Sequence, residues 1–313
     1  MAKQAAKFVV LPSMAKILIT GGSGLLGHRL TQLLLERGDQ VAHLGRKENL
    51  KSAVPCFRWD PNAGYLDEAA FVGVDHVIHL AGAGIADARW TSSRKKELIN
   101  SRVLGTRLLA QSIAQLDNKP KSCIAASAVG YYGDVQNRLC TEDDAPGDDF
   151  LAEICVAWEK ENQQLSTFLP LSIVRIGIVL SLEGGALPKM ALPIRFFAGS
   201  VLGRGTQFMS WIHIDDLCRL FLHLLDHPEH TGIYNGVAPI PEQHQTVMRA
   251  IGRQLNRPVW LWVPGLALRL LLGEMASTVL TGQQVSNDKI LQMGFKFQYG
   301  NIHSALKNLF QKP

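Results

Sequence analysis

The feature that most constrains the fold is the glycine-rich segment TGGSGLLG at residues 20–27, which directly follows an apolar, β-branched run, Lys16–Thr20, and opens a helical pattern. A strand, a glycine-rich turn and a helix N-terminus in this order form a site where backbone N–H groups bind the pyrophosphate of a dinucleotide. Gly21 allows the tight turn, Gly24 lets the backbone approach the pyrophosphate, and Gly27 allows close packing of helix and strand. The alternative, a structural turn without a ligand, is disfavoured because both the strand and the helix are in place. We expect contacts to the ligand from Thr20, Gly21, Gly22, Ser23, Gly24, Leu25, Leu26 and Gly27.

The end of the second predicted strand, HLGRK at residues 43–47, favours NADP(H) over NAD(H) as the dinucleotide. An NAD enzyme usually supplies an acid about 20 residues after the loop to bind the ribose 2′-hydroxyl. Here Asp39 comes too early and Glu48 follows two cations. Arg46 can bind a 2′-phosphate through its forked guanidinium, and Lys47 adds a second charge. The alternative is that Arg46 and Lys47 are solvated loop residues.

The rest of the first half alternates short apolar runs with amphipathic helical patterns, which indicates a parallel sheet with helices on both faces. The expected strands are Lys16–Thr20, Gln40–Leu44, Cys56–Trp59, His76–Leu80, Ser122–Ser127 and Leu171–Ile176. The expected helices are Gly24–Arg37, Ser92–Ala114 and Phe150–Gln164. The fold class is therefore α/β: a Rossmann-type doubly wound parallel sheet with a smaller C-terminal α/β lobe.

Glycine and proline punctuate the chain after about residue 181, which indicates a change of domain. We expect a loose extension at residues 1–13, a dinucleotide-binding Rossmann domain at 14–180, and a smaller substrate-side lobe at 181–313 that is partly interleaved with the first. A ligand should lie in the cleft between them, at the carboxyl edge of the sheet. The apolar stretch Val259–Leu272 contains a proline, a glycine and an arginine and falls short of the ~18 apolar residues of a membrane span, so we interpret it as a buried strand and helix.

Charge and cysteine content argue against several other classes of function. The net charge is +5, but the basic residues are spread along the chain and the densest cluster, 94–96, is followed directly by Glu97. This pattern favours a solvated helix face over a nucleic-acid site. The five cysteines show no C-x-x-C spacing and the histidines are scattered, so we expect no disulfide framework, no metal and a reducing, cytoplasmic compartment. We expect a small-molecule substrate and no nucleic-acid or membrane partner.

Six motifs, in order along the chain, carry a resemblance to a known family. They are TGGSGLLG at 20–27, WD at 59–60, HLAG at 79–82, SAVGYYGD at 127–134, VRIGIVL at 174–180 and WIHIDD at 211–216. With these motifs the chain resembles the extended short-chain dehydrogenases/reductases, the NAD(P)-dependent epimerase/dehydratase family. LAGAGIADARW at 80–90 and FLAEICVAWE at 150–159 narrow the resemblance to its atypical YfcH-like group. The resemblance implies a fold and a cofactor rather than a substrate.

The resemblance also implies roles for further residues around the cofactor. Asp60 would contact the adenine, although a turn residue before Pro61 is a nearly equal interpretation. Ser127 ends the fifth strand, where such enzymes keep a hydroxyl that hydrogen-bonds the reacting oxygen, and a capping role is its alternative. Further residues expected to line the cofactor are Leu80, Ala81, Gly82 and Arg175.

The predicted helix at 150–164 lacks the residues with which this family moves a proton. Family members use a tyrosine and a lysine four residues apart, because the nearby cation stabilises the phenolate of a phenol whose pKa is otherwise about 10. Aligning the family's glutamate with Glu159 places Leu151 and Cys155 at these two positions, and a shift of one residue gives Phe150 and Ile154. None of the four can act as a general acid, so the sequence argues against ordinary dehydrogenase or epimerase chemistry.

Other residues are candidates to replace this pair. Tyr132 follows Ser127 closely, and Lys189 lies on a glycine-flanked segment expected to face the nicotinamide end, so these three are the candidate catalytic residues. Packing is the alternative for Tyr132. For His213, the preferred alternative to a ligand contact is a structural role, in which the imidazole is hydrogen-bonded within the protein and links the two lobes. The residues placed on the substrate side are Arg89, Trp90, Arg195 and His213.

Two interpretations of function remain at this point. The first is an NADP(H)-dependent oxidoreductase or nucleoside-diphosphate-sugar epimerase of atypical mechanism. The second is a catalytically inactive nucleotide-binding protein with a regulatory or scaffold role. The polar, glycine-rich cleft segment favours the first, and the missing tyrosine and lysine favour the second. The helices predicted at 92–114 and 150–164 are also candidates for a homodimer interface, unless their apolar residues face the protein's own sheet.

Overall fold

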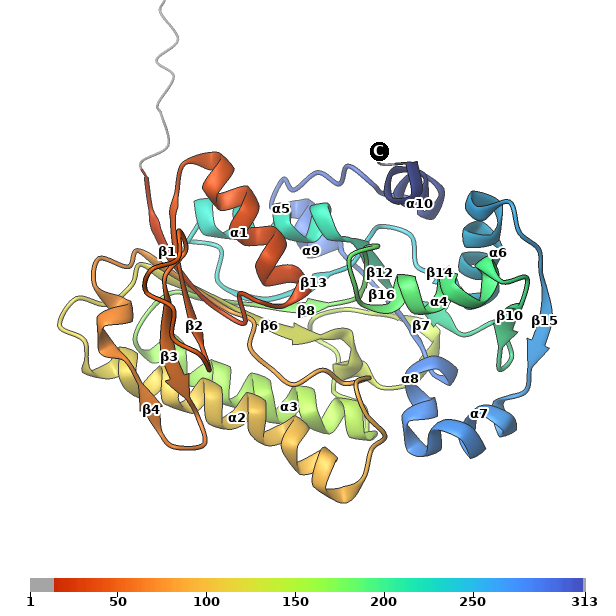
Figure 1. Ribbon diagram of the computed structural model, residues 1–313, viewed down its shortest axis with the longest axis horizontal. Coiled ribbons are helices and arrows are strands. Elements are labelled where there is room, and N and C mark those ends of the chain that lie inside the picture. Colours follow the sequence, from red (N-terminus) through yellow and green to blue (C-terminus); the bar gives the residue numbers. More distant parts are fainter. Residues whose placement is uncertain (1–13, 312–313) are drawn as a thin grey trace, which may run out of the picture.

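A computed structural model describes residues 14–311, and its centre is an eight-stranded sheet (Figure 1). The strand order is β13-β8-β6-β5-β1-β2-β3-β4, and all neighbours are parallel except β3 and β4. This order confirms the Rossmann-type doubly wound sheet, whereas the expected extension at residues 1–13 lies outside the described residues. The bounds are β1 Lys16–Thr20, β2 Gln40–Gly45, β3 Cys56–Asp60, β4 Tyr65–Leu66, β5 His76–His79, β6 Ser122–Ala128, β8 Leu171–Ile176 and β13 Gly232–Gly236.

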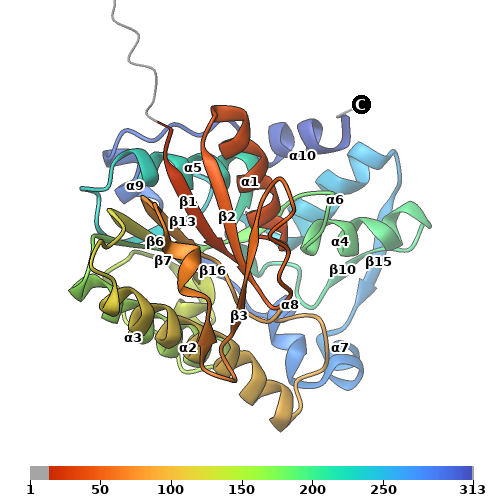
Figure 2. The same cartoon turned by 60° about the vertical axis from the view of Figure 1, so that its left-hand side comes forward.

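Helices cover both faces of this sheet (Figure 1). α1 and α5 lie on one face, and α2 and α3 lie side by side on the other, as the turned view also shows (Figure 2). Alternate residues of β1 serve the two faces, because Ile17 and Ile19 belong to the core under α1 while Leu18 belongs to the core under α2. The apolar residues Leu109 and Ile113 of α2 thus pack on the sheet of their own chain. The bounds are α1 Leu25–Arg37, α2 Ser92–Gln115, α3 Phe150–Gln163 and α5 Ile214–Asp226.

The chain after β8 contributes both to a smaller lobe and to the main sheet. α4, β10, α6, β15 and α7 gather on the right of Figure 1. Between β10 and α6 the chain returns to the main sheet, where β13 pairs in parallel with β8. The strand expected within the apolar stretch Val259–Leu272 is confirmed as β15, which pairs with β10. The remaining bounds are η1 Glu68–Phe71, η2 Val129–Tyr132, β7 Val135–Cys140, η3 Gln164–Thr167, β9 Ile178–Leu180, α4 Ala186–Arg195, β10 Gly199–Leu202, β11 Phe208–Met209, β12 Trp211–His213, β14 Glu242–Gln243, α6 His244–Leu255, β15 Val259–Val263, α7 Gly265–Leu272, η4 Gly273–Ala276, α8 Ser277–Leu280, β16 Gln283–Val285, α9 Asp288–Gln292 and α10 Ile302–Gln311.

The apolar stretch that contains β15 and α7 is exposed, so its interpretation as a buried strand and helix was wrong. Trp260 and Trp262 are 68% and 64% exposed, and on α7 only Leu268 is buried. Among the described strands β15 pairs with β10 alone, and the face of this two-stranded sheet that carries Trp260 and Trp262 is exposed. Across residues 14–311, no helix is both long enough and apolar enough to cross a membrane.

Candidate functional site

The glycine-rich segment at residues 20–27, called the phosphate loop from here on, joins β1 to α1. Gly21 has a φ of +73°, and a Cβ atom there would lie 3.1 Å from the backbone nitrogen of Ala81. A Cβ atom on Gly27 would collide with the Gly21 carbonyl oxygen and lie 2.7 Å from the Gly22 Cα atom. A larger residue at either position must displace backbone atoms, so the shape of the loop depends on these glycines.

The phosphate loop ends at the N-terminus of α1, which has no side-chain cap. α2, α3 and α5 begin at residues whose side chains accept a first-turn N–H, but α1 begins at Gly24, which has no side chain to do so. Gly24 is exposed, and its own N–H donates to the Gly21 carbonyl at 3.0 Å. A phosphate at this helix N-terminus would accept the hydrogen bonds that no side chain accepts. These residues therefore fit the pyrophosphate of a dinucleotide.

Thr20 acts from beneath the loop rather than at its surface. It is fully buried, and its Oγ1 accepts hydrogen bonds from the N–H groups of Leu80 and Ala81 at 3.1 Å each. The same hydroxyl lies 2.7 Å from Nδ1 of His79, whose Nε2 lies 2.9 Å from the Thr106 hydroxyl. Burial lowers the pKa of His79 to about 4, so this histidine is neutral near pH 7. The side chain of Thr20 thus joins the ends of β1 and β5, in contrast to the ligand contact expected for it.

The end expected to hold the adenosine half lies at β2 and β3. Arg46 and Lys47 follow β2 directly and are exposed, so both side chains can reach a ligand at this edge. Asp60, at the end of β3, accepts hydrogen bonds on Oδ1 from the N–H groups of Asn62 and Ala63 at 3.2 Å each. Asp60 therefore fulfils the alternative role, that of a turn residue before a proline.

Helix α4 and the loop that follows β5 contact each other. The Lys189 ammonium on α4 donates to the carbonyl of Ala86 at 3.3 Å, which brings α4 against the loop that follows β5. In that loop the Trp90 indole N–H donates to the Ile85 carbonyl at 2.9 Å, and its ring packs edge-on against Phe150 at 5.0 Å. Lys189, a candidate catalytic residue, and Trp90, a candidate substrate-side residue, thus both contact the loop that follows β5. The exposed residues Arg89 and Arg195 have no ion pair among the described residues.

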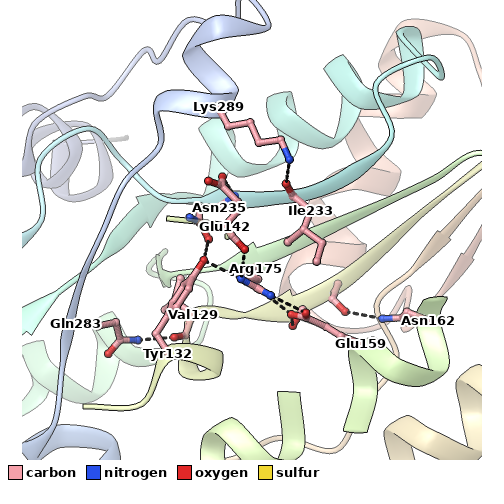
Figure 3. Close-up of polar contacts among 12 residues, drawn as sticks. Val129, Tyr132, Glu142, Glu159, Asn162, Arg175, Ile233, Asn235, Gln283 and Lys289 are labelled. Atoms are coloured by element: carbon pink, nitrogen blue, oxygen red, sulfur yellow. Dashed lines mark hydrogen bonds and ion pairs between the residues drawn. The ribbon is translucent and has the colours of Figure 1, made fainter. Parts of the chain in front are cut away.

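Arg175 differs most from its expected role as a cofactor ligand. Only 1% of it is exposed, and its guanidinium donates to both carboxylate oxygens of Glu159 at 2.9 Å, as Figure 3 shows. Its Nη1 donates to the Tyr132 hydroxyl at 2.9 Å and to the Glu142 carbonyl at 3.1 Å. The guanidinium also lies 3.4 Å from the centre of the Tyr131 ring. Arg175 therefore joins β8 to α3 from inside the protein, and its contacts are to protein groups.

The same network occupies two of the candidate catalytic residues. The Ser127 hydroxyl donates its single proton to Oε1 of Glu159 at 2.6 Å, so it has no second proton for a reacting oxygen. The Tyr132 hydroxyl donates to Oδ1 of Asn235 at 2.7 Å and only 2% of the residue is exposed (Figure 3). Burial raises the pKa of Tyr132 although Arg175 lies beside it. For Tyr132 the alternative, a buried structural role, therefore agrees with its contacts.

The helix α3 carries packing residues where the family's proton-transfer pair would stand. A Cβ atom on Gly130 would lie 3.3 Å from Cβ of Leu151 and 3.8 Å from Sγ of Cys155, so both side chains pack under the turn after β6. Burial raises the pKa of the Cys155 thiol to about 12, which keeps it protonated near neutrality. The lysine within α3, Lys160, is exposed.

His213 caps a helix from the interior. It is fully buried, and its Nδ1 accepts a hydrogen bond from the N–H of Asp215 at the start of α5 at 3.0 Å. Its ring lies 4.0 Å from the ring of Tyr299, near the C-terminus. These contacts match the preferred alternative, a satisfied structural histidine, rather than a ligand contact.

Sequence reasoning did not identify two side chains that are important to this site. The sequence predicts no role in the site for Glu159, yet it accepts hydrogen bonds from Ser127 and Arg175. Arg102, in the middle of α2, is 8% exposed and its guanidinium lies beside Gly82. A charged residue on the apolar face of an amphipathic helix is the pattern that could have revealed each of them. Within residues 14–311, no three His, Cys, Asp or Glu side chains are grouped to hold a metal ion.

Comparisons with known proteins cover nearly the whole chain. The sequence pattern of the NAD-dependent epimerase/dehydratase family matches residues 17–235, and that of a domain of unknown function (DUF1731) matches residues 263–309. An epimerase family protein of Staphylococcus saprophyticus is 38% identical, over 95% of this chain and 99% of its own. The chloroplastic SDR39U1 homologue of Arabidopsis thaliana is 34% identical, over 97% and 91% respectively. The crystal structure of human SDR39U1 with NADPH has a TM-score of 0.87 at 30% identity, over 95% of this chain and all of that one.

Proposed function

The chain belongs to the NAD-dependent epimerase/dehydratase family, within its atypical YfcH-like group, and we propose that it binds NADP(H) at the phosphate loop and uses it in oxidoreductase or epimerase chemistry on a small molecule. The observation that carries this proposal is the α1 N-terminus, where Gly21, Gly24 and Gly27 leave backbone N–H groups open to a pyrophosphate. The human relative SDR39U1 was crystallised with NADPH, which supports the same dinucleotide here.

Arg46 supports the phosphorylated form of the cofactor. It stands exposed at the end of β2, where the ribose 2′ position of a dinucleotide falls in a Rossmann sheet. Asp60 is engaged by the N–H groups of its own turn, and neither Asp39 nor Glu48 lies at the end of the strand. An arginine at this place favours a 2′-phosphate because its planar fork matches phosphate geometry.

Replacing Arg46 with alanine should raise the Kd for NADPH about tenfold or more, because a charge-assisted hydrogen bond contributes about 1.5–3 kcal/mol. The Kd for NADH, which has no 2′-phosphate, should change less than about twofold. Fluorescence titration with both nucleotides measures this difference, and Lys51→Ala, an exposed cation in the same loop, is the matched control. Equal losses for the two nucleotides would show that Arg46 does not bind the 2′-phosphate.

The proposed chemistry needs a proton source outside the helix α3. When bound, a nicotinamide supplies or accepts a hydride. The Ser127 hydroxyl donates its hydrogen bond to Glu159, and the Tyr132 hydroxyl is buried and donates to Asn235. Lys189 is exposed, so it is the candidate that remains on the open side of the site. Its ammonium could stabilise the developing charge on a substrate oxygen or donate a proton to it. Arg89, Trp90 and Arg195 would border the same substrate.

A Lys189→Met variant tests the catalytic proposal. We expect kcat for NADPH-dependent reduction to fall about 100-fold to 10,000-fold, the usual effect of losing a general acid. The Kd for NADPH should stay within about twofold, because Lys189 lies on α4 and not at the phosphate loop. The assay follows NADPH absorbance against a panel of aldehydes, quinones and nucleotide sugars, with Lys160→Met on α3 as control. An unchanged kcat would remove Lys189 from the mechanism.

The second candidate function is a regulatory or scaffold protein that binds the nucleotide without chemistry. The observation that favours it is α3, where Leu151 and Cys155 pack against the fold and no tyrosine in the sequence is followed by lysine four residues later. Tight binding of NADPH together with no turnover across the whole substrate panel would favour this function over the enzyme.

A further inference from the structure

The sequence of β15 and its two flanking residues reads the same in both directions. Residues 258–264 are Pro-Val-Trp-Leu-Trp-Val-Pro, with Leu261 at the centre. β15 itself consists of the five residues between the two prolines, Val259–Val263. Proline has no backbone N–H to donate, so Pro258 and Pro264 limit any strand pairing to these five residues. When such a strand pairs antiparallel with a second copy of itself, every residue faces a residue of its own type.

One edge of β15 is open to such pairing. β15 pairs in parallel with β10 on one side, and no strand among residues 14–311 pairs with its other side. In Figure 1 β15 is the outermost element on the right. Val259–Val263 contains no charged residue and no proline, which are common means by which proteins protect an open strand edge. An apolar edge of this kind is suited to bind another strand.

The two tryptophans of β15 leave this edge free. Nε1 of Trp260 donates to the carbonyl of Phe197 at 3.0 Å, and Nε1 of Trp262 donates to the carbonyl of Gly203. Phe197 precedes β10 and Gly203 follows it, so both indoles lean toward β10 and away from the open edge. A second strand therefore has room to approach the backbone of β15.

Phe197 lies beside this strand in an unfavourable backbone conformation. Its φ is 60°, in the left-handed region where a helix usually ends on glycine or asparagine. The side chain is exposed, and the Arg257 guanidinium lies 4.5 Å from the centre of its ring. Neither burial nor the end of α4 requires a phenylalanine here. Such an outlier indicates that the side chain has a contact outside its own chain.

The exposed apolar surface around β15 is large enough for a stable interface. Six side chains of α4, β15, α7 and the turn after α4 are each more than half exposed: Phe196, Phe197, Trp260, Trp262, Leu266 and Leu270. At about 200 Å² for a fully exposed aromatic side chain and about 100 Å² for a leucine, they offer roughly 700 Å². The largest apolar patch of a typical monomer is about 300–600 Å², whereas a standard interface buries about 800 Å² per partner, including its polar rim.

We propose that β15 forms the interface of a homodimer, in which the open edges of two copies pair antiparallel about a twofold axis through Leu261. Leu261 then faces its own counterpart, and Trp260 of each copy faces Trp262 of the other. Such cross-strand pairs of aromatic and branched residues stabilise an antiparallel ladder. The strands β10 and β15 of both copies form one four-stranded sheet, and each contact occurs twice, as a twofold interface requires. This interface replaces the one that the sequence suggests on the helices α2 and α3.

The twofold axis also joins the two exposed ends of this surface. Because the strands run antiparallel, the start of α7 in one copy, with Leu266, lies next to the Phe197 end of β15 in the other. η4 follows α7, and its Glu274 forms an ion pair with Lys95 on α2. The dimer would therefore hold in place the segment that connects the smaller lobe to the N-terminus of α2.

The test measures the mass of the full chain in solution by sedimentation velocity. Wild type should be a dimer with a Kd in the micromolar range or below, as for other interfaces of this size. Leu261→Lys should raise this Kd at least about a hundredfold, because two like charges would face each other at the axis. Leu261→Glu should do the same. An equimolar mixture of the two variants should regain the dimer, since each lysine then faces a glutamate. Leu35→Lys, at an exposed leucine on α1, is the matched control and should leave the dimer intact.

A cysteine variant gives a second measurement that does not depend on charge. Opposite residues of an antiparallel pair have Cα atoms about 4.5 or 5.5 Å apart, within the range that a disulfide spans. Mild oxidation of Leu261→Cys should therefore yield a covalent dimer on a non-reducing gel. Wild type, whose cysteines are buried or half-buried, and Leu35→Cys should stay uncrosslinked. This measurement decides the matter if far-UV circular dichroism shows that the charged variants do not fold.

Three results would overturn the proposal. The first is a wild-type protein that stays monomeric at all concentrations. The second is a dimer that survives both Leu261→Lys and Leu261→Glu, which would place the interface elsewhere. The third is a failure of the two variants to form a mixed dimer together with no crosslink in Leu261→Cys. If a monomeric wild type bound vesicles of phosphatidylcholine and phosphatidylserine and Leu261→Glu did not, the same face would belong to a membrane surface instead.

Discussion

Replacing Arg175 with methionine should lower the free energy of unfolding by about 3–5 kcal/mol, the usual cost of removing one partner of a buried ion pair. The loss is large because Glu159 would remain buried with its charge uncompensated, held only by the Ser127 hydroxyl. The Tyr132 hydroxyl would keep its bond to Asn235 but lose the donor on its other side. Urea unfolding followed by far-UV circular dichroism measures the change.

Two further variants separate the buried pair from a general effect of losing an arginine. Arg107→Met breaks the more exposed pair with Glu161 and should cost only about 0–1 kcal/mol. The double variant Arg175→Met with Glu159→Met removes both charges and should recover most of the stability, because replacing a whole buried pair by apolar groups is often nearly neutral. A loss below about 1 kcal/mol for Arg175→Met alone would contradict a stabilising role for the pair.

Replacing Gly27 with alanine should raise the Kd for NADPH about a hundredfold, equivalent to losing about two hydrogen bonds from backbone N–H groups to phosphate. The added methyl group meets the Gly21 carbonyl and the Gly22 Cα, which are backbone atoms and cannot move without opening the phosphate loop. The overpacking should also cost about 1–3 kcal/mol in stability, although alanine is the better helix former by about 1 kcal/mol. Nucleotide titration and urea unfolding measure the two effects.

Gly300→Ala is the control for this substitution. The nearest atoms to a Cβ there belong to Pro239 at 3.6 Å and 3.8 Å, an ordinary contact, so neither nucleotide affinity nor stability should change. Gly24→Ala should have an effect between those of Gly27→Ala and Gly300→Ala. Gly24 is exposed, and its added Cβ would meet only the Gly21 oxygen at 3.3 Å. It should lose affinity with little loss of stability. Wild-type affinity in Gly27→Ala would mean that the pyrophosphate lies elsewhere.

Much of the main sheet could be predicted because its strands are short, apolar and bounded by turns. β1 and β8 have the predicted ends, and α1, α2 and α3 each differ from prediction by one residue at one end. β13 was not predicted, because Gly232–Gly236 offers two apolar residues between glycines and owes its pairing to β8. The exposure of Trp260 and Trp262 was also missed, since an apolar run shows the same pattern whether or not another layer covers it.

The candidate site could be predicted where the chemistry depends on neighbours in sequence, as in the phosphate loop. It could not be predicted where partners are distant along the chain. Arg175 was expected on the cofactor, but its carboxylate partner lies on α3 and its hydroxyl partner follows β6. His213 became a helix cap through Asp215, and its burial depends on Tyr299 near the C-terminus. Burial decides these roles, and no local pattern encodes it.

β13 also determines the order in which this sheet can be completed during translation. The nascent chain presents β8 well before β13, since α4, the smaller strands and α5 are made between them. Until Gly236 leaves the ribosome, β8 is an open edge that carries the apolar residues Ile173 and Val174. Open apolar edges invite pairing with other chains, so the interval before β13 arrives is the period in which this protein most needs a chaperone.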